Sequence, residues 1–171
     1  MTEKLKVCLV GATGVGKTSL VTRYTRSIFS ELYRTTIGVS IERRDVKRSD
    51  GTVALVIWDM SGEDEFQSVQ AAYLRGAAGY LAVIDGTRRD TVDVALALEA
   101  RVRSTIGSLP FVAAINKCDL ALSWQLGGAL EMLERKGWRL VRTSAKTGEG
   151  VEDMFAALVD EIHAARRLAW T

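Results

Sequence analysis

The sequence predicts an α/β fold: a doubly wound, mostly parallel six-stranded sheet with one antiparallel edge strand and about five helices. Three observations support it. Short apolar runs alternate with segments of helical periodicity, a GxxxxGKT pattern stands where the first run meets the first helix, and polar motifs follow several later runs. The 171 residues contain no repeat or proline-rich linker, so we expect a single domain over 1–171.

Six runs of residues have the character of strands. Five of them are continuously apolar, as parallel strands are when helices cover both faces of a sheet. The sixth, 39–46, alternates apolar and polar residues and is joined to the run at 53–58 through 49–51, a hairpin turn sequence. We therefore expect an antiparallel edge strand there. The five apolar runs are 5–10, 53–58, 80–84, 111–115 and 140–141.

Apolar residues spaced three and four positions apart predict helices between these strands. One stripe covers 20–24, one covers 95–106 with Asp90 as its N-cap, a third covers 126–133, and the widest covers 151–162. We expect all four stripes to face the core. Ligand sites of such sheets lie at the carboxyl ends of the strands, where every motif below falls.

The GxxxxGKT pattern occupies 11–18, between the first strand and the first helix. Its glycines let the backbone wrap closely, successive N–H groups point inward, and the helix adds its positive N-terminal end. Lys17 then reaches the outer phosphates of a ligand, and the Thr18 hydroxyl holds the magnesium ion that bridges them. The alternative, an ordinary glycine-rich turn, is disfavoured by the strand before and the helix after. The predicted phosphate-binding residues are Gly11, Thr13, Gly14, Val15, Gly16, Lys17, Thr18 and Ser19.

Three further motifs follow later strands. After 53–58, Asp59 can hold magnesium and the N–H of Gly62 can meet a terminal phosphate. The carboxylate of Asp119 can accept two hydrogen bonds from the imino and amino groups of guanine, whereas adenine offers no matching donor pair. The N–H of Ala145 can meet the guanine carbonyl. The remaining predicted contacts around the base are Asn116, Lys117, Ser144 and Lys146.

Taken in order, these motifs resemble those of the small GTPases of the Ras superfamily, and of Rab-like members most closely. The resemblance spans nearly the whole chain through GATGVGKT, TIG, WDMSGE, NKCD and TSAK. It implies a molecular switch that binds GTP and GDP with magnesium and hydrolyses GTP slowly, with Thr36 ligating the metal in the GTP form. It also implies that Phe29 packs on the guanine and Tyr33 closes over the phosphates, although plain packing is the alternative for both.

Two departures from the family pattern bear on catalysis. Glu63 stands where most members have a glutamine that orients the attacking water. A carboxylate can accept a hydrogen bond from water, but it cannot donate to phosphoryl oxygens and it adds negative charge. Thr13 stands where Ras-type members have glycine, and its side chain can crowd a helper protein's arginine. The implied catalytic residues are Lys17, Thr36, Gly62 and Glu63, and the sequence leaves open whether Glu63 and Thr13 raise or lower hydrolysis.

An apolar surface is the predicted meeting point with other proteins. Ile41, Trp58 and Tyr73 occupy the positions of the triad through which Rab-type proteins meet their partners. If the three side chains are exposed, they form an apolar patch that suits docking of another protein. The alternative, which has equal weight, is that all three are buried under the switch segments, 34–38 and 62–73. With Ile37 and Phe66 they form the expected surface for effector, exchange-factor and activating proteins.

Composition excludes other classes of partner. The 23 basic and 21 acidic side chains give a net charge of +2, which does not favour nucleic acid. No apolar run approaches the ~20 residues that span a bilayer, and neither Thr2 nor the chain end encodes a lipid anchor. The two cysteines lack ligand spacing and suit a reduced compartment. We expect a cytoplasmic monomer with no lipid anchor.

Two other functions are weighed against the switch GTPase. The first is a GTP-binding scaffold without useful hydrolysis, motivated by Glu63 and Thr13. The second is a P-loop kinase of small molecules, which shares only the opening loop and predicts a preference for adenine. The later motifs favour the switch over the kinase.

Overall fold

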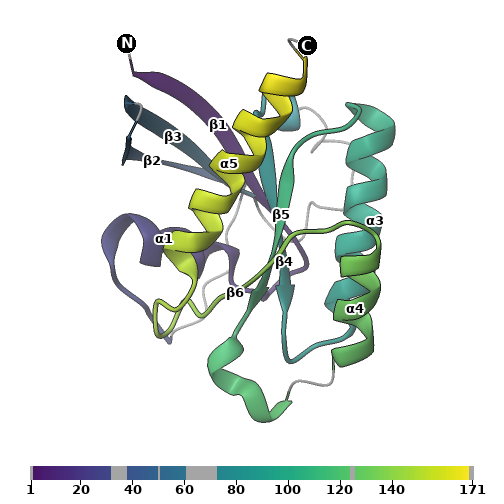
Figure 1. The fold of residues 1–171 in the computed structure, drawn as a ribbon. Helices are drawn as coiled ribbons and strands as arrows, with labels where there is room; N and C mark the ends of the chain where they lie inside the picture. The colour runs from purple at the N-terminus through teal and green to yellow at the C-terminus, as the bar shows by residue number, and fades with distance from the viewer. Residues whose placement is uncertain (1, 32–37, 50, 61–72, 124–125, 170–171) are drawn as a thin grey trace.

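The structure alternates strands and helices around one sheet (Figure 1). It is a computed structural model, and the residues that it describes are 2–31, 38–49, 51–60, 73–123 and 126–169.

Six strands form the sheet, in the order β2-β3-β1-β4-β5-β6. Every neighbouring pair is parallel except β2 and β3, which are antiparallel. The predicted fold class is therefore confirmed, including the antiparallel strand at one edge. The strands are β1 (Glu3–Val10), β2 (Val39–Arg48), β3 (Gly51–Met60), β4 (Gly79–Asp85), β5 (Phe111–Asn116) and β6 (Leu140–Arg142).

The described residues contain four α-helices and a short 3-10 helix at Cys118–Ser123, against about five helices predicted. The prediction that Asp90 caps its helix is wrong: Arg89 is the capping position, and Asp90 is the first helical residue. The Asp90 carboxylate instead pairs with Arg88 at 2.9 Å, while its charge lies in the first helical turn, which favours acidic groups. The helices are α1 (Lys17–Arg26), α3 (Asp90–Thr105), α4 (Gly127–Arg135) and α5 (Val151–Ala169).

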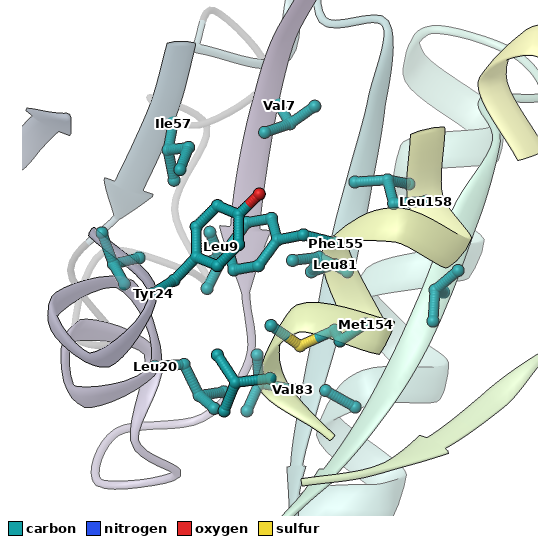
Figure 2. Close-up of a cluster of buried hydrophobic side chains, with 14 of the residues drawn as sticks. Val7, Leu9, Leu20, Tyr24, Ile57, Leu81, Val83, Met154, Phe155 and Leu158 are labelled. Atoms are coloured by element: carbon teal, nitrogen blue, oxygen red, sulfur yellow. The ribbon is translucent and has the colours of Figure 1, made fainter. Parts of the chain in front are cut away.

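Alternate side chains of β1 point to opposite faces of the sheet and enter different apolar clusters, so both faces of the sheet are buried. Val7 and Leu9 pack with α1 and α5, whereas Cys8 packs with α3. Figure 2 shows the first cluster, in which the ring of Tyr24 from α1 stacks on Phe155 from α5 with centroids 3.8 Å apart. The predicted apolar stripe on 151–162 thus faces the core, as expected.

The sheet contains five parallel strands, β1, β3, β4, β5 and β6, and their carboxyl ends all lie along the same edge of the sheet. The loops that leave these ends carry the motifs singled out from the sequence, so the fold gathers them at one place. Among the described residues, no helix combines the length and the apolar character that crossing a membrane requires.

Candidate functional site

The loop between β1 and α1 adopts a backbone that only glycine tolerates at two positions. Gly11 has φ +150° and Gly16 has φ +100°. A Cβ atom would lie 2.4 Å from the Val83 carbonyl oxygen at the first position and 2.4 Å from the Asn116 amide nitrogen at the second. The loop therefore presses against β4 and β5, which side chains at these glycines would prevent.

The carbonyl oxygens of 13–15 accept hydrogen bonds from side chains outside the loop. A trans peptide points its C=O and N–H in opposite directions, so these bonds turn the N–H groups of Gly14 and Gly16 to the other side. Backbone N–H groups turned to one side form a concavity suited to an anion. The N–H of Val15, between them, donates to the Ala12 carbonyl at 3.4 Å. The donors are Arg88 Nη1 to Thr13 at 3.0 Å, Lys117 Nζ to Gly14 at 2.9 Å and Asn116 Nδ2 to Val15 at 2.9 Å.

Lys17 is the first residue of α1 and is only 6% exposed. Its ammonium group donates to the carbonyl oxygens of Gly11 at 2.6 Å and Ala12 at 3.1 Å, so it lies across the loop. A cation in this position adds to the positive N-terminal end of the helix. The arrangement can bind a polyanion, as the sequence predicts.

Asp59 and Thr18 meet beside this loop. The Thr18 hydroxyl donates to Asp59 Oδ2 at 2.5 Å, while Asp59 Oδ1 is buried and has no hydrogen-bond partner among the described residues. Burial raises the pKa of the Asp59 carboxyl, opposed by the Thr18 hydrogen bond and the charge of Lys17. A buried carboxylate oxygen without a partner fits a cation, and magnesium prefers oxygen ligands.

The described residues contain no cluster of three or more His, Cys, Asp or Glu side chains that could hold a metal by itself. Magnesium sites commonly combine one or two carboxylates with phosphate oxygens and water, so the Thr18 and Asp59 pair fits that ion. Thr36, the third predicted ligand, lies outside the described residues, as do Tyr33, Ile37, Gly62, Glu63 and Phe66.

Asn116, at the end of β5, links three loops. Its amide nitrogen donates to the phosphate loop at Val15, as given above, and its Oδ1 accepts from Thr143 Oγ1 at 3.2 Å and from the Ala145 N–H at 3.3 Å. The side chain is 2% exposed. These contacts account for both heteroatoms of the amide, so Asn116 joins the phosphate loop to the loop after β6.

Lys117 follows Asn116 with a left-handed backbone, φ +66°, and its ammonium reaches two groups. It bonds the Gly14 carbonyl and pairs with Asp85 Oδ2 at 2.7 Å. Asp85 is fully buried, and its Oδ1 accepts from the N–H and hydroxyl of Thr87 at 2.9 and 2.7 Å. Sequence reasoning missed Asp85, although an acidic residue closing an apolar strand is a signal that could have found it.

The predicted base-recognition residues meet between the loops after β5 and β6. The Ser144 hydroxyl donates to Asp119 Oδ1 at 2.7 Å, and the same hydroxyl accepts from the Thr147 N–H at 3.1 Å. Asp119 is exposed, whereas Ala145 is 4% exposed. Lys146 is exposed, with its ammonium 3.4 Å from Glu31.

Two arginines at the site were missed from the sequence because neither stands in a motif. Arg88 bonds the Thr13 carbonyl, as described above. Arg23, on α1, donates through Nε to the Ala145 carbonyl at 2.8 Å and through Nη2 to the Lys146 carbonyl. A helical periodicity does not reveal such contacts, since a long polar side chain on a partly exposed face has many possible partners.

The described members of the predicted partner surface differ in exposure. Ile41 is 55% exposed, while Trp58 and Tyr73 are half-buried with their rings 6.0 Å apart. Ile41 lies opposite Trp58 in the β2 and β3 pairing. Burial of all three, the alternative from the sequence, therefore does not hold for Ile41. Phe29 is half-buried and packs against the core cluster of α1 and α5.

Comparison with known proteins identifies the family of this chain. The model of the Ras family matches residues 6–164. The chain is 35% identical to Ras-related protein Rab11C of Lotus japonicus, over 92% of this chain and 74% of that protein. It is 34% identical to RABA1c of Arabidopsis thaliana over the same shares, and 34% identical to Rab-12 of Mus musculus over 93% of this chain and 67% of that protein. The chain therefore belongs to the Ras family, as a Rab-like small GTPase.

Proposed function

We propose that this chain is a magnesium-dependent switch that binds GTP and GDP at the edge of the sheet and hydrolyses GTP slowly. The observation that carries the proposal is the linkage through Asn116, whose amide bonds the phosphate loop on one side and Ala145 on the other. One ligand with a polyphosphate at one end and a base at the other spans such a pair of loops. Asp119, beside Ala145, supplies the acceptor that favours guanine.

Phosphate and metal binding are assigned to the β1 and α1 junction. Lys17 and the N–H groups of the loop hold the phosphates, and Thr18 and Asp59 hold magnesium together with Thr36 in the GTP form. When bound, magnesium neutralises negative charge on the phosphate oxygens. The buried Oδ1 of Asp59 supports this assignment, because a cation there removes an uncompensated buried acceptor.

Hydrolysis is an in-line attack of water on the terminal phosphorus. A new P–O bond forms as the bond to the bridging oxygen breaks, and GDP, inorganic phosphate and a proton result. Lys17 stabilises the charge that develops on the phosphoryl oxygens, and Gly62 donates through its N–H. Glu63 accepts a hydrogen bond from the water without donating to the phosphoryl group, which is why we propose a low intrinsic rate.

Other proteins bind the switch through a surface that comprises Ile41, Trp58 and Tyr73, together with Ile37 and Phe66. The exposure of Ile41 beside the half-buried ring of Trp58 supports this role, because apolar side chains at such a patch lose water on docking. We further propose that the chain works in the cytoplasm as a monomer.

A second candidate is a scaffold that holds GTP without useful turnover. Glu63 motivates it, together with Thr13, which is exposed at the loop while its carbonyl is fixed by Arg88. Its side chain can obstruct an arginine from a helper protein, a group worth roughly 10³ to 10⁵ in rate.

Single-turnover hydrolysis separates the two candidates. The protein is loaded with GTP, freed of excess nucleotide and sampled over hours for GDP. Slow conversion that Glu63→Gln accelerates supports the switch with a weakened catalytic residue. No conversion by the wild type, with turnover restored by Glu63→Gln, would establish the scaffold instead.

A further inference from the structure

We propose that Arg23 is a positioning residue that sets the loop after β6 for recognition of the carbonyl of guanine. The inference rests on the proposed function, since it concerns how the same site reads the base. It assigns to α1 a second task, because this helix also begins at the phosphate loop.

The guanidinium of Arg23 holds two consecutive carbonyl groups. Its Nε donates to Ala145 O at 2.8 Å, and its Nη2 donates to Lys146 O. The planar fork of arginine can serve two acceptors at once in a fixed geometry, which a lysine ammonium does not reproduce. Arg23 is thus matched to this stretch of backbone rather than to a side chain.

These bonds fix the direction of the peptide groups. The carbonyl groups of Ala145 and Lys146 point toward α1, so the N–H groups of Lys146 and Thr147 point away from it. The Thr147 N–H accordingly meets the Ser144 hydroxyl at 3.1 Å. Arg23 holds the Ala145 carbonyl and thereby orients the Lys146 N–H of the same peptide group, while Asn116 accepts a hydrogen bond from the Ala145 N–H. The two adjacent N–H groups that can face the guanine carbonyl are therefore both positioned by side chains from outside the loop.

The position of Arg23 on α1 joins the two ends of the site. It lies six residues after Lys17, about 9 Å along the helix axis at 1.5 Å per residue. A shift of α1 therefore moves the phosphate-binding end and the base loop together. Loss of the guanidinium frees the base loop from the helix while leaving the contacts of Lys17 in place.

Arg26 provides a matched control on the same helix. It is also an arginine near the C-terminal end of α1, but its guanidinium pairs with Glu42 of β2, and its side chain is 60% exposed. Removing it takes the same charge from α1 without touching the base loop. An effect of the lost charge alone should appear in both variants.

The test compares two nucleotides that differ in one atom. GDP has a carbonyl oxygen on the base, and 6-thioguanosine diphosphate has sulfur in its place, a weak acceptor. Dissociation constants of both are measured for the wild type, Arg23→Ala, Arg23→Lys and Arg26→Ala. We expect the wild type to prefer GDP, Arg23→Ala to weaken GDP by about tenfold and lose most of that preference, and Arg23→Lys to recover part of it. Arg26→Ala should match the wild type.

The ratio of the two constants decides between positioning and stability. If Arg23→Ala weakens both nucleotides equally, or if Arg26→Ala has the same effect, Arg23 only supports the fold and the inference is overturned. Equal affinity of the wild type for both nucleotides overturns it too, while the proposed function stands. A wild type that binds no guanine nucleotide would refute the proposed function itself. The thio-nucleotide also reports folding, since it still needs an intact phosphate site.

Discussion

Replacing Asn116 with alanine should loosen the site and destabilise the folded protein. The substitution removes three hydrogen bonds in a side chain that is 2% exposed: those with Val15 O, Thr143 Oγ1 and the Ala145 N–H. At about 1 kcal/mol for each bond between neutral groups, the loss is about 3 kcal/mol. A domain of this size loses roughly 2–4 °C of Tm per kcal/mol, so we expect a decrease of about 6–12 °C.

The assay is thermal unfolding of the GDP-loaded protein by circular dichroism, with GDP release measured in parallel. Both should change, because Asn116 joins the phosphate loop to the base loop. Ser104→Ala is a suitable control, since its hydroxyl makes an exposed bond to Arg101 O within α3. A decrease in Tm of less than about 2 °C, with unchanged GDP release, would refute the reasoning that the linkage stabilises the site.

Three further substitutions or modifications test other parts of the account. Gly16→Ala should abolish tight GDP binding, because φ is +100° there and the added Cβ would lie 2.4 Å from Asn116 Nδ2. Gly127→Ala should retain binding in the same titration, since a Cβ at that position has no neighbouring atom within 4 Å. Equal affinities of the two variants for GDP would contradict the glycine requirement. Asp59→Asn should make GDP release equally fast in magnesium and in EDTA, whereas the wild type should release GDP more slowly in magnesium; a variant that keeps the wild-type response would remove Asp59 from the metal site. Cys8 is fully buried with its pKa raised to about 12, so thiol reagents at pH 8 should modify it only after unfolding, and prompt labelling seen by mass spectrometry would contradict this.

The strands could be predicted because their apolar runs report burial directly. All six are present, although β2 extends to Arg48, beyond the predicted end at 46, because its last residues are polar on an edge strand. The predicted N-cap of α3 was wrong because the backbone already has helical dihedral angles at Arg89, φ −62° and ψ −35°, one residue before the acidic residue that a capping pattern favours.

The site residues that belong to a motif could be predicted from the sequence. Those whose side chains contact residues far away in the sequence could not. The pairing of Thr18 with Asp59 joins two motif residues. Arg23 instead meets Ala145, 122 positions away, through a side chain whose sequence neighbours give no hint of that partner. Contacts of this kind come from packing α1 beside α5, which only the folded chain specifies.

The central claim is that one guanine nucleotide binds at the carboxyl ends of the strands, among the loops after β1, β5 and β6. Its most direct test is the identity of the nucleotide released when the purified protein is denatured, separated by chromatography and quantified against protein. We predict about one guanine nucleotide per chain, GDP or GTP, and that excess ATP added beforehand does not displace it. Release of an adenine nucleotide, or displacement of the guanine nucleotide by ATP, would contradict the account.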